Sequence, residues 1–119
     1  MSSLEQRLHD DLTAAIRSRD EVRSSTLRMA LTAVKNEAVS GTEARELSDA
    51  DVIVVLGREA KKRRESATAY DEASRPELAE ATLANLRHDD ALAMTGQAVA
   101  VETEAELRVT RTRVIATAP

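Results

Sequence analysis

Residues 46–80 read ELSDADVIVVLGREAKKRRESATAYDEASRPELAE and contain the clearest helix start in the chain. Ser48 precedes two aspartates, Asp49 and Asp51, and a serine cap followed by acidic residues is typical of a helix N-terminus. The apolar residues that follow recur every three or four positions, which predicts one buried face on a helix. That face consists of Val52, Val55, Leu56, Ala60, Ala67 and Tyr70.

The residues before this helix repeat the pattern twice. The first helix is predicted to begin at Ser2 or Ser3, because Ser3 and Gln6 have the spacing of a capping box. Asp20 is a suitable cap for the second helix, and Gly41 is placed for a left-handed stop. The expected buried stripes are Leu4, Leu8, Leu12, Ala15 and Ile16 in the first helix, and Leu27, Ala30, Leu31, Val34 and Ala38 in the second.

A fourth helix follows from the segment Ser74-Arg75-Pro76-Glu77, which combines a cap, an early proline and a capping-box glutamate. It is predicted to end near Ala93. Gly57 lies inside the third helix and is either simply tolerated there or marks a close crossing of another helix. The expected buried or supporting positions of the fourth helix are Leu78, Ala79, Thr82, Leu83 and Leu86.

The expected fold is all-α, with a small N-terminal bundle of three to four helices over residues 1–95 and a weakly structured C-terminal tail. Residues 96–119 alternate small, apolar and polar residues and are rich in Thr, Val and Arg. This pattern fits either disorder or a short hairpin over 97–115. We expect such a small core to gain stability from a second copy of the chain or from a larger partner.

The composition excludes several classes of protein. Aromatic residues are 1% of the chain and cysteine is absent, which argues against a β-sandwich, disulfides and thiolate metal sites. Two histidines are too few for most histidine-based metal sites, so no metal or cofactor is expected. No apolar run is long enough to span a membrane, and the N-terminus lacks a signal peptide's apolar core. These features predict a cytoplasmic protein without membrane attachment.

The net charge is −4, so any contact with nucleic acid must come from local clustering of basic residues. One cluster lies in the third helix, on the side away from its apolar face, and the second helix adds two cations seven residues apart. Basic residues late in a helix also suit the helix dipole, so the cluster is either a solvated surface or a site for a phosphate backbone. The candidate phosphate-binding residues are Arg28, Lys35, Arg58, Lys61, Lys62 and Arg64.

Glu59 and Arg63 project near the middle of the apolar face and are four residues apart. A charge in that position is costly unless it is paired. The two residues are therefore predicted to form a structural ion pair or to line a polar site. His88-Asp89-Asp90, near a helix end, is predicted to be solvated. No thiol, nucleophile elbow or glycine-rich phosphate loop is present, so no catalytic residues are assigned.

The segments DEVRSSTLRMALTAVKNEAV (20–39) and 46–80 resemble the GatB/YqeY family. Four pieces in the family's order carry the likeness: STLRMALTAVKNEAV, the L-S-D-A-D helix start, the run KKRRESATAY and the restart R-P-E-L. The opening helix matches as well, so the resemblance covers about residues 2–80.

The resemblance implies a small, cytoplasmic, all-helical protein with an N-terminal bundle and a C-terminal three-helix part. That second part is similar to the tail domain of the B subunit of glutamine-dependent tRNA amidotransferases, which contacts tRNA. By this similarity the family is described as having carbon–nitrogen ligase activity with glutamine as amido-N-donor. We interpret that description as taken over from the amidotransferase, not as an activity of the small protein alone. From Leu83 onward this chain departs from the family, with no Tyr-Leu-Pro turn and no recognisable three-helix part.

Three functions remain open at this point. The first is an accessory protein that contacts tRNA or a tRNA-amidation complex through the basic cluster. The second is a non-catalytic helical module that docks on a larger protein or forms a homo-oligomer. The third is an enzyme in its own right, for which the residues offer no catalytic constellation.

Overall fold

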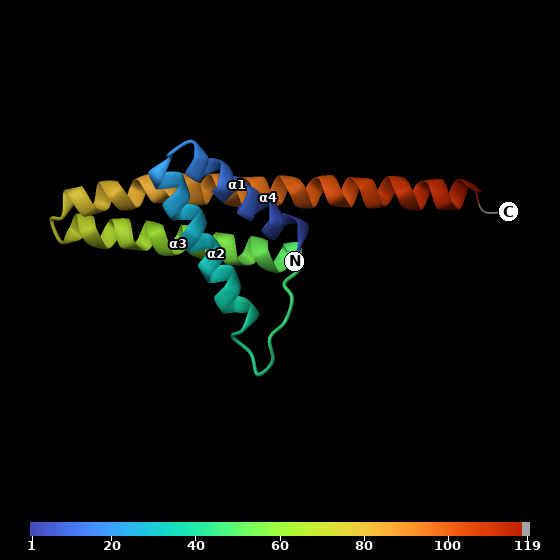
Figure 1. Ribbon diagram of the computed structural model, residues 1–119, viewed down its shortest axis with the longest axis horizontal. Coiled ribbons are helices and arrows are strands. Elements are labelled where there is room, and N and C mark those ends of the chain that lie inside the picture. Colours follow the sequence, from blue (N-terminus) through green and yellow to red (C-terminus); the bar gives the residue numbers. More distant parts are fainter. Residues whose placement is uncertain (118–119) are drawn as a thin grey trace.

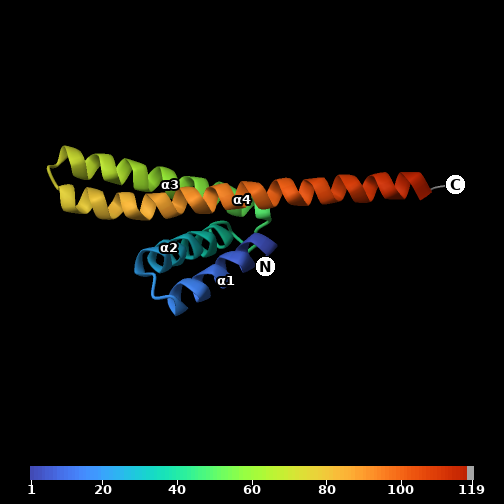
Figure 2. The ribbon, with the colours of Figure 1, turned by 90° about the horizontal axis from the view of Figure 1, so that it is seen from above.

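The computed structural model describes the backbone of residues 1–117 and the side chains of residues 1–96, and within this part the regular structure is entirely helical. The four helices are α1 (Ser3–Arg17), α2 (Glu21–Ala38), α3 (Asp49–Glu72) and α4 (Pro76–Thr117). The predicted all-α fold is confirmed. Figures 1 and 2 show two layers: α3 and α4 form a long antiparallel hairpin, and the shorter α1–α2 hairpin lies across it.

The helix starts follow from their capping residues, as predicted. The Asp20 carboxylate accepts a hydrogen bond from the Arg23 N–H at the start of α2. Ser48 forms a full capping box with Asp51 at the start of α3. At the start of α1, Ser2 is the cap, and its hydroxyl accepts from the Glu5 N–H. The predicted box partners Ser3 and Gln6 therefore lie inside the helix.

The roles predicted for Gly41 and Ser74 at helix ends are wrong. Gly41 is not a left-handed stop, because no glycine among the described residues has positive φ and α2 already ends at Ala38. The left-handed residues are Arg19 (φ 58°) and Ser74 (φ 56°), which make the tight turns of the two hairpins. Ser74 is thus a turn residue, and the Arg75 carbonyl accepts the first hydrogen bond of α4, from the Ala79 N–H.

The core lies where the two hairpins cross, and it is built from aliphatic side chains of all four helices. Most of the predicted stripe residues are buried, but Ile16 is 49% exposed, and Tyr70, Leu78 and Leu83 are each about 40% exposed. Tyr70 and Leu78 flank the α3–α4 turn, which Figure 2 shows extending past α2, so the crossing hairpin does not cover them. The core consists of Leu4, Leu8, Ala15, Leu27, Ala30, Leu31, Val34, Leu47, Val52, Val55, Leu56 and Leu92.

Glycine marks one close helix crossing, and it is not at Gly57. A Cβ built at Gly57 would meet nothing within 4 Å, so Gly57 is a tolerated helical glycine. A Cβ at Gly96 would lie 3.2 Å from Ile53 Cγ1 and 3.3 Å from Leu4 Cδ2. The absence of a side chain at Gly96 therefore lets α4 approach α1 and α3 closely.

Helix α4 is much longer than the sequence indicates. The predicted end near Ala93 and the alternative of a hairpin over 97–115 are both wrong, because the backbone continues as one helix to Thr117. Ala, Glu, Leu and Arg in this segment favour helix and outweigh its Thr and Val residues. Figure 1 shows this end of α4 projecting past the other helices. Within the described range, no helix combines the length and apolar character that crossing a membrane requires.

Candidate functional site

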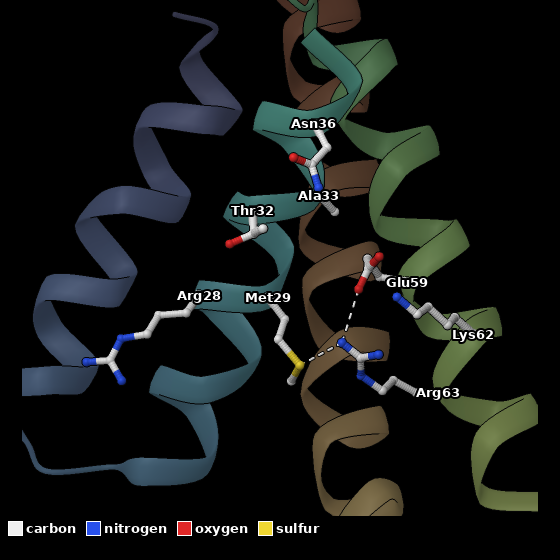
Figure 3. A pocket seen from close by; sticks show the side chains of 8 residues that line it. All are labelled: Arg28, Met29, Thr32, Ala33, Asn36, Glu59, Lys62 and Arg63. Atoms are coloured by element: carbon white, nitrogen blue, oxygen red, sulfur yellow. Dashed lines mark hydrogen bonds and ion pairs between the residues drawn. The ribbon is translucent and has the colours of Figure 1, made fainter. Parts of the chain in front are cut away.

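Two overlapping cavities, of about 330 and 320 Å³, form a groove between α2 and α3, here called the α2–α3 groove. Figure 3 shows one of them, with α4 running behind it. The α2 wall contains Arg28, Met29, Thr32, Ala33, Asn36, Glu37 and Ser40, and the α3 wall contains Val55, Arg58, Glu59, Lys62 and Arg63. Four of these side chains are cationic and two are carboxylates, so the groove is polar and carries both signs of charge.

The helical repeat explains which of the predicted cations meet here. Arg58 and Lys62 are four residues apart on α3 and line one of the two cavities, and Arg28 of α2 lines the other together with Lys62. The structure therefore brings Arg28, Arg58 and Lys62 to one groove. Lys35 lies on the same side of α2 as Arg28 but outside this groove. Lys61 is exposed and is also absent from the groove walls.

Two of the predicted phosphate-binding residues already have acidic partners. Arg58 Nη2 lies 3.0 Å from Glu37 Oε2 of α2, and Arg64 Nη2 lies 3.2 Å from Asp90 Oδ1 of α4. Both pairs join helices, and in each the arginine side chain is more than half exposed to solvent. Arg58 and Arg64 therefore present less net positive charge to a ligand than their position on α3 indicates.

Glu59 and Arg63 form an ion pair that opens onto the groove, with 3.1 Å between Arg63 Nη2 and Glu59 Oε2. Both side chains are only 12% exposed. The Arg63 guanidinium also contacts the sulfur of Met29, as the dashed lines in Figure 3 show. On its other side, Arg63 Nε lies 3.7 Å from Asp89 Oδ2 of α4. One guanidinium thus stands between two carboxylates at the meeting point of α2, α3 and α4.

Asp89 is the buried charge that sequence reasoning missed. The prediction that His88-Asp89-Asp90 is solvated is wrong for Asp89, which is 2% exposed, whereas His88 and Asp90 are partly exposed. Asp89 Oδ2 has no hydrogen-bond partner among the described residues. Burial raises the pKa of Asp89 to about 6; Arg63 opposes the rise, and Glu59 and Asp90 add to it. The signal for its burial is its place on the face of α4 that also carries Leu92 and Leu86.

A second groove lies on the other side of α2, against α1, and no sequence pattern indicated it. This α1–α2 groove has a cavity of about 280 Å³. Its lining residues are His9, Leu12, Arg28, Leu31, Thr32 and Lys35. In the sequence His9 belongs only to a charged stretch of the first helix, yet the groove places it beside two of the predicted cations. The side chain of Arg28 extends from α2 toward α1 in Figure 3.

The described residues offer binding chemistry more readily than catalysis. Among residues 1–96 no three His, Asp or Glu side chains cluster closely enough to hold a metal ion. Glu59 and Arg63 form an ion pair with each other. Exposed cations on α2 and α3, with hydroxyl and amide groups between them, are suited to binding an anion.

Comparison with known proteins assigns most of the chain to one family. The model of the YqeY-like protein family matches residues 5–87, which cover α1, α2, α3 and the first part of α4. None of the curated proteins compared with the chain matches it. Because the family model covers more than half of the chain, the protein belongs to the YqeY-like family.

Proposed function

We propose that this YqeY-like protein is a non-catalytic accessory factor that binds tRNA, in association with glutamine-dependent tRNA amidation. The observation that carries the proposal is the gathering of cations along α2 and α3: Arg28 and Lys62 line one cavity of the α2–α3 groove, and Arg58 and Lys62 line the other. Lys35 and Lys61 extend the exposed positive charge on either side. The carbon–nitrogen ligase label of the family is inherited from the amidotransferase likeness, and the catalytic step belongs to a partner enzyme.

The chemistry of these residues favours backbone contacts over base recognition. Lys and Arg neutralise phosphates without regard to sequence, and the release of counterions makes the affinity fall with salt. Base stacking needs aromatic platforms, and the chain has a single aromatic residue, Tyr70. The proposed ligand is therefore a folded RNA whose phosphates face the protein.

Filter binding of unfractionated tRNA at about 50 and about 200 mM salt tests this proposal. Lys62 lacks an ion pair among the described side chains, so Lys62→Glu, which reverses its charge, should weaken binding by about fourfold. Arg58→Gln should have a smaller effect because Glu37 already compensates Arg58. Absence of binding at the lower salt concentration, or affinity unchanged in a Lys61→Glu/Lys62→Glu double variant, would refute the proposal.

A second candidate function, a protein-interaction module, is favoured by one specific observation. Leu83 and Met94 lie on the same side of α4 and are 41% and 71% exposed. The two side chains lie about 16 Å apart along the helix, so they would act as two separate anchor points for a partner and not as one continuous patch. Light scattering at several concentrations separates this candidate from the first: a dimer that Met94→Gln dissociates supports it, and a strict monomer that binds tRNA rejects it.

A further inference from the structure

The two grooves that flank α2 differ in their charge. The α2–α3 groove contains Glu37 and Glu59, and each lies within ion-pair distance of a groove cation. The α1–α2 groove is lined by two permanent cations and a histidine, with no acidic residue among its lining side chains. An incoming phosphate therefore meets carboxylate repulsion in the first groove and none from the walls of the second.

The spacing along α2 suits more than one phosphate. Arg28, Thr32 and Lys35 are four and three residues apart, so they lie on one face of the helix. Arg28 and Lys35 are separated by about 10 Å along the helix axis, at about 1.5 Å per residue. Thr32 places a hydroxyl donor between them. A backbone strand running along α2 can thus be held at two points and hydrogen-bonded between them.

The other residues of this groove leave its cations available to a phosphate. Leu12 and Leu31 line the same cavity and carry no charge. Among the described residues, neither Arg28 nor Lys35 has an ion-pair partner, so neither must break an existing pair to bind a phosphate. His9 closes the α1 side, where its imidazole can donate a hydrogen bond to a phosphate oxygen.

We infer that the α1–α2 groove is the main binding site for RNA phosphates, which contact His9, Arg28, Thr32 and Lys35. The α3 cations Lys61 and Lys62 make secondary contacts. This inference rests on the proposed function, since it names where the tRNA binds. It moves the main contact from the basic run of α3, which the sequence emphasises, to α2 and α1.

Matched substitutions test it by fluorescence anisotropy with labelled tRNA at about 50 mM salt. His9→Glu, Lys35→Gln and Lys62→Gln each lower the formal net charge by one. The control Arg7→Gln makes the same change on α1, at an exposed position that lines neither groove. His9→Glu and Lys35→Gln should each weaken binding by about fivefold to tenfold, Lys62→Gln by about twofold, and Arg7→Gln by less than about twofold. Circular dichroism should show the wild-type helical signal in each variant, and Lys35, being exposed, keeps the test valid if His9→Glu unfolds.

The outcomes separate the inference from the function on which it rests. If Lys62→Gln weakens binding while Lys35→Gln and His9→Glu match Arg7→Gln, the inference is overturned and tRNA binding stands. If wild-type protein binds no tRNA, both are overturned. If a polyglutamate peptide binds with the same dependence on Lys35 while tRNA does not, the groove is an acidic-protein site and the inference is again overturned.

Discussion

Replacing Asp89 with asparagine should make the protein more stable at neutral pH. Asp89 is 2% exposed, and burial raises its pKa to about 6, from an ordinary value of 3.8. A raised pKa means that the folded state binds this proton more tightly than the unfolded state. The stability associated with protonated Asp89 is therefore complete below pH 3.8 and is lost as the pH rises through about 6.

The magnitude follows from the two values. A difference of about 2.2 pKa units, at about 1.36 kcal/mol per unit, corresponds to about 3 kcal/mol of unfolding free energy. An asparagine side chain cannot ionise and has nearly the same shape as aspartate, so the variant should not suffer this loss. The unfolding free energy of Asp89→Asn minus that of the wild type should thus increase by about 3 kcal/mol between about pH 4 and about pH 8.

Urea unfolding followed by circular dichroism at several pH values measures this difference directly. Taking the difference between the two proteins removes the contributions of other carboxyl groups. These include Asp51, whose pKa is lowered chiefly by the backbone hydrogen bond from Ser48. Glu65→Gln, at an exposed position of α3, is the control and should stay within about 0.5 kcal/mol of the wild type. A difference curve for Asp89→Asn that is flat, or that falls as the pH rises, would refute the assignment of Asp89 as a buried carboxyl group with a raised pKa.

Three other sets of substitutions test the packing. Arg63→Ala should destabilise the protein by about 3–5 kcal/mol in urea unfolding, because it leaves Glu59 and Asp89 buried without a cation; a loss below about 1 kcal/mol would contradict the ion cluster. Gly57→Ala should raise the stability by about 1 kcal/mol, since nothing opposes a Cβ there. Gly96→Ala should instead lower it, because the buried Leu4 cannot move aside, and equal thermal shifts for the two variants would argue against the close crossing at Gly96. Ser48→Ala should cost about 1 kcal/mol by removing the capping box of α3, measured as a fall in thermal midpoint, and an unchanged midpoint would speak against that cap.

The features predictable from the sequence are those set by neighbouring residues. The caps at Asp20 and Ser48, the hairpin restart at Pro76 and the aliphatic stripes all depend on spacing within one helix. The features that were missed depend on contacts between helices. Glu37 neutralises the charge of Arg58 only because α2 lies beside α3. The space around Gly96 is small only because Leu4 and Ile53 both pack against it.

In the candidate site, too, the features set within one helix could be predicted and those set by contacts between helices could not. Arg28 and Lys62 could be named from their sequence positions, and the Glu59–Arg63 pair follows from four-residue spacing. Asp89 could not be recognised as the third member of that cluster. It stands between two polar residues, His88 and Asp90, so the sequence around it shows no apolar pattern, and its partner Arg63 lies on a different helix. His9 could not be connected to Arg28 and Lys35 before the crossing of α1 and α2 was known.

The salt dependence of tRNA affinity tests the central claim most directly. Four of the candidate cations lack an ion pair among the described side chains: Arg28, Lys35, Lys61 and Lys62. With about 0.7–0.9 counterions released per phosphate contact, the plot of log affinity against log salt should have a slope of about −3. A Lys35→Gln variant should reduce that slope to about −2. A wild-type slope near zero, or no binding at about 50 mM salt, would show that the cations of α2 and α3 do not bind the RNA backbone.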